Sequence, residues 1–270
     1  MTKAGVDFGS SLVKAVWVEN GFKQYFSTAD CSLKKIAYSM AQADVTQINV
    51  AGIGYSPERV QEFVSYGMKV KSFEGDAILN EIQSQAHGAR QLLEEHIDNF
   101  LLVSIGTGTS YTSINGENTT KFPLGNSLGG GFLHGLGQVL GIQDYTKIAA
   151  TNEASLDLCI KDMIPEKVGS FEGEMAIANL GKGKINSEKS SALASAVNII
   201  ASTTIKDIML YGMIPHFQVP NDVVYIGSTI SHTPLLKNLL QAYTLAIGKT
   251  PHFPKRGEFA LALGAMISED

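Results

Sequence analysis

The chain has 270 residues, of which 44% are hydrophobic and 17% charged, and its formal net charge is −5. This length suits one large globular domain or two smaller lobes. The negative charge and the lack of any Lys/Arg run argue against nucleic acid or an anionic membrane as partner. No apolar stretch predicts a membrane span, the first residues predict a strand and not a signal peptide, and the two cysteines lie far apart. We therefore expect a cytoplasmic protein without a disulfide framework.

The first hundred residues predict three strands in succession, followed by alternating helices and strands. Asn20-Gly21 is a hairpin-turn pair. Ser56-Pro57 predicts a helix start, because Ser is favoured at the N-cap and Pro at the first helical position. Strands are expected over residues 4–7, 12–18, 24–27 and 47–53, and helices over residues 32–43, from Ser56 onward and over residues 77–93. This order is typical of an RNase H-like unit.

The second part of the chain repeats this opening. An apolar strand over residues 100–105 runs into a Gly/Thr loop, and a second strand over residues 110–114 meets the turn pair Asn115-Gly116. The repetition predicts an internal duplication, with lobes at residues 1–97 and 98–270. Further elements are predicted over residues 187–211 (helix), 223–226 (strand), 233–246 (helix) and 258–267 (helix).

Each repeated opening contains a loop that can bind phosphate. In the first, Asp7 ends a strand and a loop of small residues, Gly9, Ser10 and Ser11, leads to Lys14. Small residues let backbone N–H groups approach phosphate oxygens, an Asp at a strand end can hold Mg²⁺, and a Lys can neutralise phosphate charge. An ordinary tight hairpin is the alternative.

The second loop has the same character, with Gly106, Thr107 and Gly108 after an apolar strand. Two such loops facing one another would hold a triphosphate from both sides. Because the loop recurs in the same local context, phosphate binding is favoured over a plain turn.

Two further glycine sites are candidates for nucleotide contact. Gly129, Gly130 and Gly131 enter a predicted helix, although each glycine costs a helix about 1 kcal/mol. Contact with a nucleotide at the helix N-terminus would offset this cost, and close packing of the backbone is the alternative. Gly227 and Ser228 follow the strand at residues 223–226, where an adenosine subsite and a plain strand–helix turn fit equally well.

A catalytic carboxylate is expected on the helix at residues 77–93. Glu81 lies at the edge of its apolar stripe, where a carboxylate can face a cleft and act as a general base. Spacing alone favours a solvated helix flank for this residue, and Glu74, Glu94 and Glu95 are equally eligible.

These motifs together resemble the type II pantothenate kinases, and the resemblance extends over the whole chain. The motifs are the two loops, the run at residues 129–137, the strand end at residues 225–228 and the segment 257–265. The resemblance implies a duplicated actin-like ATPase fold of the α/β class, with two lobes around an ATP cleft. It also implies a homodimer that uses dimerisation helices of the second lobe, and Mg²⁺-dependent transfer of phosphate from ATP to the primary hydroxyl of pantothenate, the first committed step to coenzyme A.

Carried over residue by residue, the resemblance gives each position a role. Asp7 would serve Mg²⁺ through water. Glu81 would be the catalytic carboxylate, because Glu81 to Gly88 matches the family's Glu-x₆-Gly pattern. Residues 9–11, Lys14, residues 106–108, residues 129–131 and residues 227–228 would face ATP. The substrate side would be formed by Thr109, Ser110, Lys121 and Tyr243.

The chain departs from the family at a pantothenate-binding position. The family has an Arg seven residues before its Gly-Gly-Gly run, and here that position is Phe122, with Lys121 beside it. Arg and Lys are not interchangeable in a bidentate site. A kinase of the same fold for a related alcohol or sugar therefore stays open as an alternative, as does a non-catalytic actin-like ATP-binding regulator.

Overall fold

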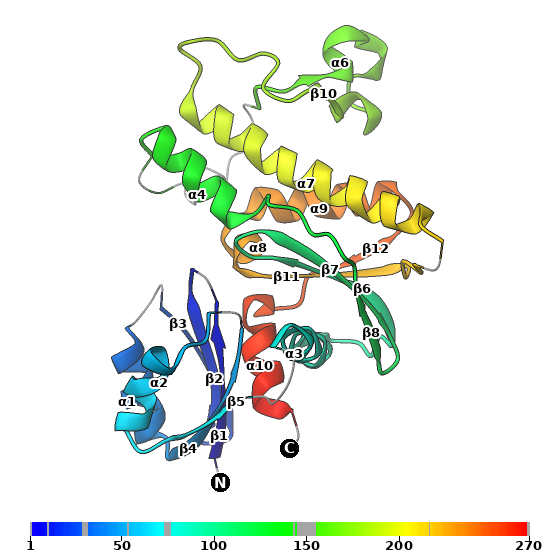
Figure 1. Ribbon diagram of the computed structural model, residues 1–270. Coiled ribbons are helices and arrows are strands. Elements are labelled where there is room, and N and C mark those ends of the chain that lie inside the picture. The colour runs from blue at the N-terminus through cyan, green and yellow to red at the C-terminus, as the bar shows by residue number, and fades with distance from the viewer. Residues whose placement is uncertain are drawn as a thin grey trace.

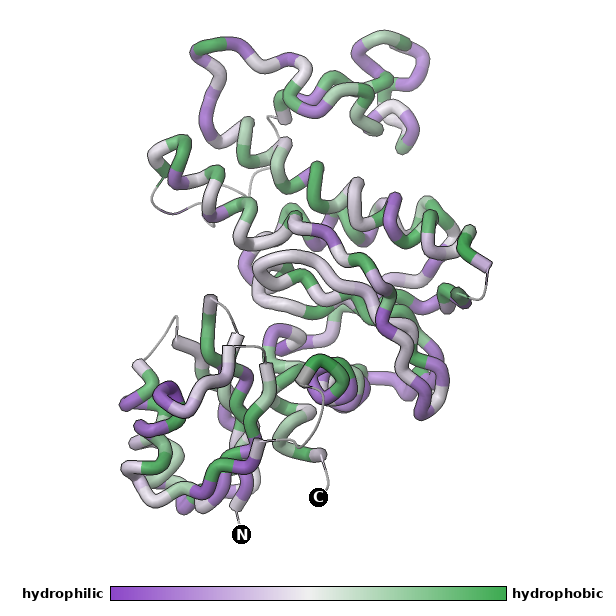
Figure 2. Tube along the Cα trace, viewed as in Figure 1, coloured by the Kyte–Doolittle hydropathy of each residue, from purple (hydrophilic) through white to green (hydrophobic). Residues whose placement is uncertain are grey.

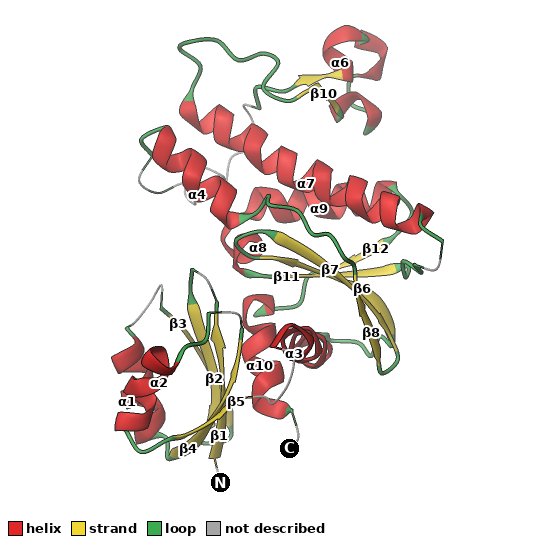
Figure 3. Ribbon diagram, in the orientation of Figure 1, coloured by secondary structure: helices red, strands yellow, loops and turns green. Residues whose placement is uncertain are grey.

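The computed structural model describes residues 2–9, 11–28, 32–52, 54–72, 77–142, 144, 155–215 and 217–268. Within these ranges, two five-stranded mixed sheets carry helices on their faces (Figure 3). The hydropathy colouring of Figure 2 shows apolar residues concentrated in the strands and in the helices between and beside the sheets. The two largest clusters of buried hydrophobic residues each join one sheet to the helices that pack on it.

The first sheet has the strand order β3-β2-β1-β4-β5. β1 pairs antiparallel with β2 and β2 with β3, whereas β4 and β5 run parallel to β1. The predicted turn at Asn20-Gly21 is confirmed, because both residues have positive φ angles, of 51° and 82°. The strands are β1 (Thr2–Phe8), β2 (Val13–Glu19), β3 (Phe22–Ser27), β4 (Val45–Ala51) and β5 (Lys69–Ser72).

The second sheet repeats the first strand by strand. Its order is β12-β11-β6-β7-β8, with β6, β7 and β8 antiparallel and with β11 and β12 parallel to β6. The duplication expected from the repeated opening is therefore confirmed. The strands are β6 (Asn99–Ile105), β7 (Thr109–Asn115), β8 (Asn118–Lys121), β11 (Asp222–Ile226) and β12 (Thr250–His252).

Two helices, α1 (Leu33–Gln42) and α2 (Pro57–Ser65), cover the outer face of the first sheet (Figure 1). The predicted cap is confirmed, since the side chain of Ser56 accepts a hydrogen bond from the backbone N–H of Arg59. Ile36 and Phe63 from these helices are fully buried against the strands. This packing fixes β1 and β4, whose carboxyl ends carry loops discussed below.

Two helices lie between the sheets, and each covers the sheet of the other half of the sequence. α3 (Ala77–Leu92) packs on the second sheet, and α10 (Ala260–Ile267) packs on the first (Figure 1). Their backbones touch: a Cβ atom added to Gly88 would lie 1.7 Å from the carbonyl oxygen of Ala260. A division at residue 97 therefore separates the two sheets but not the two helices, and the exact lobe boundary stays a prediction.

The outer face of the second sheet is covered by α7 (Lys189–Met213), α9 (Pro234–Ala246) and α4 (Gly130–Val139) (Figure 1). Among the described residues, α7 alone is long and apolar enough to cross a membrane by length and composition. However, 61% of its apolar window is buried inside the chain. Its contacts with the sheet and with α9 are those of a core helix.

An excursion at residues 155–187, which we did not predict, precedes α7. Its elements are β9 (Leu158–Cys159), α6 (Ile160–Met163), η1 (Pro165–Lys167), η2 (Glu172–Glu174) and β10 (Ala176–Ala178). A buried polar chain attaches it to the second lobe: Asn198 Nδ2 donates to Asp157 Oδ2 at 2.7 Å, and Tyr243 Oη donates to Asn198 Oδ1 at 2.7 Å.

Candidate active site

The two predicted phosphate loops meet in one cleft. The first loop joins β1 to β2 and the second joins β6 to β7, so both lie at the carboxyl end of the first strand of their sheet. The cleft has a volume of about 490 Å³. Its lining includes most of the predicted site: Asp7, Gly9, Ser11, Lys14, Glu81, Gly106, Thr107, Gly108, Thr109, Ser110, Lys121, Gly227 and Ser228.

Asp7 and Lys14 form an ion pair at the base of the first loop. They face one another across the β1–β2 pairing, and Lys14 Nζ donates to Asp7 Oδ2 at 3.3 Å. Asp7 is only 5% exposed. Burial raises the pKa of its carboxyl group, and the positive charge of Lys14 opposes this shift. Ser10, the third predicted residue of the loop, lies outside the described residues.

The two loops are in direct contact. Ser11 Oγ and Thr107 Oγ1 are 3.0 Å apart, which is a hydrogen bond between residues 96 positions apart in the sequence. Both hydroxyl groups line the cleft. Both loops therefore border the same cleft, and their binding of phosphate stays a prediction.

The glycine run at residues 129–131 supports the second loop from behind. The N–H of Gly130 donates to Gly106 O at 2.7 Å, and the N–H of Gly131 donates to Thr107 O at 3.0 Å. A Cβ atom on Gly129 would lie 2.7 Å from Thr107 O. Close backbone packing, the alternative weighed above, thus explains the run. The backbone N–H groups of Gly130 and Gly131 already donate to the second loop and are not available to a phosphate. Phosphate contact by the run stays a prediction.

A side pocket extends the cleft past the second loop. It has a volume of about 350 Å³ and lies between α4 and the short helix α8 (Ser228–His232), with His134 and His232 among its lining residues. Gly227 has φ of 116°, and a Cβ atom there would lie 2.2 Å from Ile105 O. The strand end at Gly227 therefore needs glycine in order to lie against the second loop.

Glu81 lies on the first turns of α3, half-buried, and lines the cleft. Its Oε1 accepts a hydrogen bond from Gln85 Nε2 at 3.2 Å. Of the other glutamates considered, Glu94 is on the surface and pairs with Lys255 at 3.1 Å, and Glu95 is exposed. Glu74 lies outside the described residues. Of the three candidate glutamates in the described residues, Glu81 is the one that lines the cleft.

Lys121 and Phe122 point in opposite directions, so Phe122 does not take the place of the family's arginine in the cleft. Phe122 is 1% exposed and stacks on Tyr211, with ring centroids 4.2 Å apart. Lys121, at the end of β8, lines the cleft together with Ser110 and Asn126. The cation on this strand is displaced by one residue from the family position, and one residue changes the face of a strand.

Tyr243, which we predicted beside the substrate, does not line the cleft. It lies on α9 and is 8% exposed. Its hydroxyl donates to Asn198 of α7, and its ring packs edge-on against Phe171 of the excursion. Burial raises its pKa to about 12. Within this single chain, Tyr243 therefore belongs to the core of the second lobe.

Several cleft residues were missed by sequence reasoning. Their neighbours in the cleft are distant in sequence: Gly52, Gln85, Asn126, Ile226, Glu258 and Leu261. Gly52 follows β4, which pairs with β1, and its φ is 95°. The small-residue sequence Ala51-Gly52 at a strand end was a usable signal, but only with knowledge that β4 lies beside β1.

The site fits a magnesium nucleotide. The described ranges contain no cluster of three or more His, Cys, Asp or Glu side chains for a metal. Mg²⁺ in kinase sites is usually bound by one or two carboxylates together with substrate phosphates and water. Asp7 supplies one buried carboxylate at the foot of the phosphate loops. This donor set suits a metal that arrives with its nucleotide.

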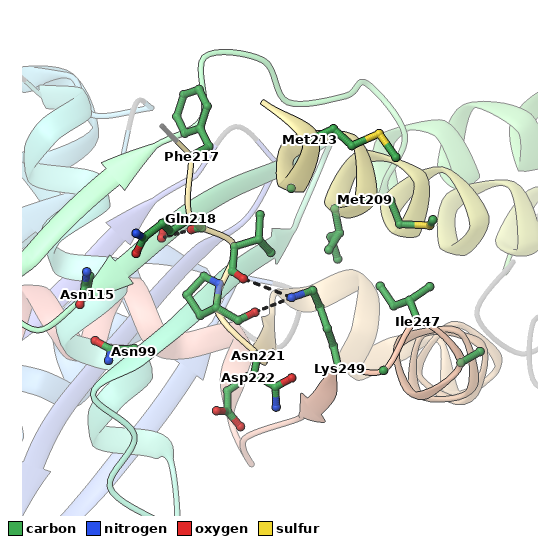
Figure 4. Close-up of a pocket in the computed structure, with 17 residues that line it drawn as sticks. Asn99, Asn115, Met209, Met213, Phe217, Gln218, Asn221, Asp222, Ile247 and Lys249 are labelled. Atoms are coloured by element: carbon green, nitrogen blue, oxygen red, sulfur yellow. Dashed lines mark hydrogen bonds between the residues drawn. The ribbon is translucent and has the colours of Figure 1, made fainter. Parts of the chain in front are cut away.

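A larger groove of about 1150 Å³ lies at the opposite edge of the second sheet (Figure 4). It surrounds the amino-terminal ends of β6 and β11, at Asn99 and Asp222, whereas the second phosphate loop follows the other end of β6 and Gly227 follows the other end of β11. In Figure 4, Lys249 Nζ donates to the carbonyl oxygens of Val219 and Pro220, at 3.2 and 2.8 Å. The groove carries none of the predicted site residues.

Two RNase H-like sheets of identical order, with a cleft between their first strands, define an actin-like ATPase fold of the α/β class. Solved structures agree. An activator of a 2-hydroxyisocaproyl-CoA dehydratase from Clostridium difficile with bound ADPNP superimposes with TM-score 0.60 and 16% identity over 98% of this chain and 93% of that chain. A ROK family glucokinase from Streptomyces griseus with glucose and AMPPNP gives TM-score 0.53 and 14% identity over 98% of both chains. These likenesses concern the fold alone.

The chain belongs to the Fumble family, whose profile matches residues 62–253. It is 28% identical to a type II pantothenate kinase of Staphylococcus saprophyticus over 98% of this chain and 99% of that protein. A type II pantothenate kinase of Bacillus anthracis is 25% identical over 97% of this chain and 96% of that protein.

Proposed function

We propose that this protein is a pantothenate kinase, which transfers the γ-phosphoryl group of ATP to the primary hydroxyl of pantothenate in the cytoplasm. The observation that carries the proposal is the meeting of two phosphate-type loops and the Glu81 carboxylate in one cleft. The family membership and the names of the relatives point to the same reaction.

The triphosphate of ATP lies between the two loops. The hydroxyls of Ser11 and Thr107 exchange their mutual hydrogen bond for hydrogen bonds to its oxygens, and Lys14 offsets its negative charge. Asp7 would hold Mg²⁺, which would supply positive charge to offset that of the phosphates. The nucleoside extends past Gly227 toward the side pocket at His134 and His232.

Glu81 acts on the acceptor alcohol. As the hydroxyl oxygen forms a bond to the γ-phosphorus, the bond from that phosphorus to the β,γ-bridging oxygen breaks and ADP leaves. The hydroxyl proton passes to the Glu81 carboxylate, which becomes a carboxylic acid and later returns the proton to water. The half-buried position of Glu81 in the cleft lining suits this role.

Lys121, Thr109 and Ser110 form the acceptor side of the cleft. Pantothenate carries a carboxylate at the end remote from its primary hydroxyl, and the Lys121 ammonium group is a partner for that carboxylate. Lys binds as a point charge and lacks the two-pronged geometry of Arg. We therefore expect weaker pantothenate binding than an arginine at this site would give.

The excursion supports a homodimer. Its surface exposes Met163 (65%), Val168 (68%), Ile177 (56%) and Ile185 (102%). Exposed apolar side chains on one segment can be buried when two copies associate, and we call these four residues the apolar patch. A dimer covering this patch would sediment at twice the chain mass, and Val168→Glu would shift the population toward monomer.

The reaction is tested by incubating the protein with Mg-ATP and a panel of alcohols, comprising pantothenate, a pantothenamide and sugars, and identifying products by mass spectrometry. Phosphopantothenate is expected as the main product. Phosphorylation of another alcohol alone would identify a different kinase. Nucleotide binding without transfer to any alcohol would favour an ATP-binding regulator.

A further inference from the structure

We propose that Gln85 is a positioning residue for the general base, and that its side-chain amide holds the Glu81 carboxylate in the orientation that accepts the substrate proton. This inference rests on the proposed kinase function and adds a residue that neither the motifs nor the family pattern pointed to.

The two side chains are neighbours on one face of α3. Residues four apart on a helix lie one above the other, so the rise of the helix brings Gln85 beside Glu81. Gln85 Nε2 lies 3.2 Å from Glu81 Oε1, within hydrogen-bond distance. Both side chains are half-buried and both line the cleft.

The backbone that carries Gln85 is held rigidly. Its sequence neighbours Ser84 and Ala86 are 1% and 0% exposed. At Ser84, α3 touches α10 so closely that a Cβ atom on Gly264 would lie 1.7 Å from Ser84 O. The amide of Gln85 therefore starts from a fixed backbone position, and its reach to Glu81 does not depend on a mobile loop.

A neutral donor suits this position. An N–H donor stabilises the ionised form of a carboxylate, which is the form that accepts a proton. It also restricts the rotation of a side chain that has three torsion angles, which favours the productive geometry. A cation would do the same but would also attract the nucleotide phosphates, which an uncharged amide avoids.

The other charged groups of the cleft lie on different elements. They are Asp7 on β1, Lys14 on β2, Lys121 on β8 and Glu258 on η3 (Gly257–Phe259). These groups also influence the proton affinity of Glu81, so the test compares variants in which all of them are unchanged.

The experiment measures kcat and KM against pH for four variants of the full-length protein. Gln85→Leu removes the donor at similar size, and Gln85→Glu replaces it with a like charge. Gln83→Leu is the matched control, because Gln83 is an exposed glutamine on the same helix that does not line the cleft. Glu81→Gln reports on the base itself. Thermal melting verifies that each variant is folded.

Gln85→Leu is expected to lower kcat about three- to tenfold with little change in either KM, the range for loss of one hydrogen bond. The acid limb of the kcat profile should shift upward, and Gln85→Glu should shift it further, by about one pH unit, because a second carboxylate disfavours ionisation of the first. Gln83→Leu should match the wild type.

Two results would overturn the inference while leaving the kinase function intact: wild-type kcat and pH profile in both Gln85 variants, or a rise in acceptor KM alone, which would make Gln85 a substrate contact. If Glu81→Gln keeps wild-type turnover, the base assignment itself fails and the inference fails with it.

Discussion

The hydroxyl oxygens of Ser11 and Thr107 lie 3.0 Å apart and join the two lobes of the protein across the cleft. Each residue occupies the loop that follows the first strand of its sheet, so the contact brings together equivalent points of the duplicated fold. A phosphate group that replaces this contact can accept one hydrogen bond from each side chain, because each hydroxyl has a single O–H to donate. We therefore expect the two hydroxyls to act on the same nucleotide.

Removing either hydroxyl should weaken nucleotide binding. Ser11→Ala and Thr107→Val each delete one donor to a charged group, a loss of about 1.5–3 kcal/mol, so the KM for ATP should rise about ten- to a hundredfold. Steady-state kinetics with ATP as the varied substrate provides the measurement. Ser113→Ala is the control, because Ser113 lines the groove at the far edge of the sheet. An unchanged KM for ATP in both cleft variants would place the nucleotide elsewhere.

Lys121 should matter for the acceptor and not for ATP. Lys121→Ala removes the cation on the acceptor side, and the KM for pantothenate should rise about tenfold or more, as for a lost charge-assisted hydrogen bond. Lys121→Arg should retain or improve binding. Kinetics with pantothenate and ATP varied separately distinguishes the two sites, and an equal rise in both KM values would argue against this assignment.

Phe122→Arg should act on stability and not on substrate binding. Phe122 is buried against Tyr211 and Phe217, with no access to the cleft. An unpaired charge at such a position costs about 3 kcal/mol or more. We expect a large fall in melting temperature, measured by calorimetry. A stable Phe122→Arg protein with a lower KM for pantothenate would show that the strand places this side chain in the cleft.

The contact between α3 and α10 should tolerate no side chain at Gly264. A methyl group there would lie 1.7 Å from Ser84 O, a backbone atom. Gly264→Ala should therefore destabilise the protein by about 1–3 kcal/mol or more. Gly135→Ala, in α4, provides the control, because no atom lies within 4 Å of the added methyl group. It should stabilise the protein by about 0.5–1 kcal/mol. Denaturant unfolding of the two variants tests the contrast, and equal stability would contradict the helix crossing.

The duplicated fold was predictable because each half opens with the same local chemistry: an apolar strand, a loop of small residues and an Asn-Gly turn. The edge strands β5, β8 and β12 were not, because runs of three or four residues carry too little periodicity. The face of a side chain also escaped prediction where strand register decides it, as at Phe122. Glycine patterns were ambiguous for a physical reason: Gly88 and Gly264 serve packing, whereas Gly9 and Gly108 line a cleft.

The buried carboxyl group of Asp7 should lower the stability of the folded protein at neutral pH, although the proposed function needs it. Its pKa is raised by burial, so the folded protein binds its proton more tightly than the unfolded chain does. The favourable contribution of the protonated form is complete below the unfolded pKa of Asp and is lost as the pH rises through the raised, folded value. Asp7→Asn should therefore melt at a higher temperature than the wild type at pH 7 to 8, with the difference shrinking at acidic pH. Melting curves across this range test the sign, and a variant that is less stable at every pH would show that the pair with Lys14 outweighs burial.

The central claim is tested most directly by following the γ-phosphoryl group itself. The wild-type protein and Glu81→Gln are each incubated with pantothenate and ATP labelled at the γ-phosphate, and ATP binding is measured in parallel by calorimetry. The wild type should transfer the label to pantothenate. Glu81→Gln should bind ATP normally but transfer the label about 10²–10⁴-fold more slowly, the usual contribution of a general base. Transfer at the wild-type rate by Glu81→Gln, or no labelled pantothenate from a wild type that binds ATP, would contradict the account.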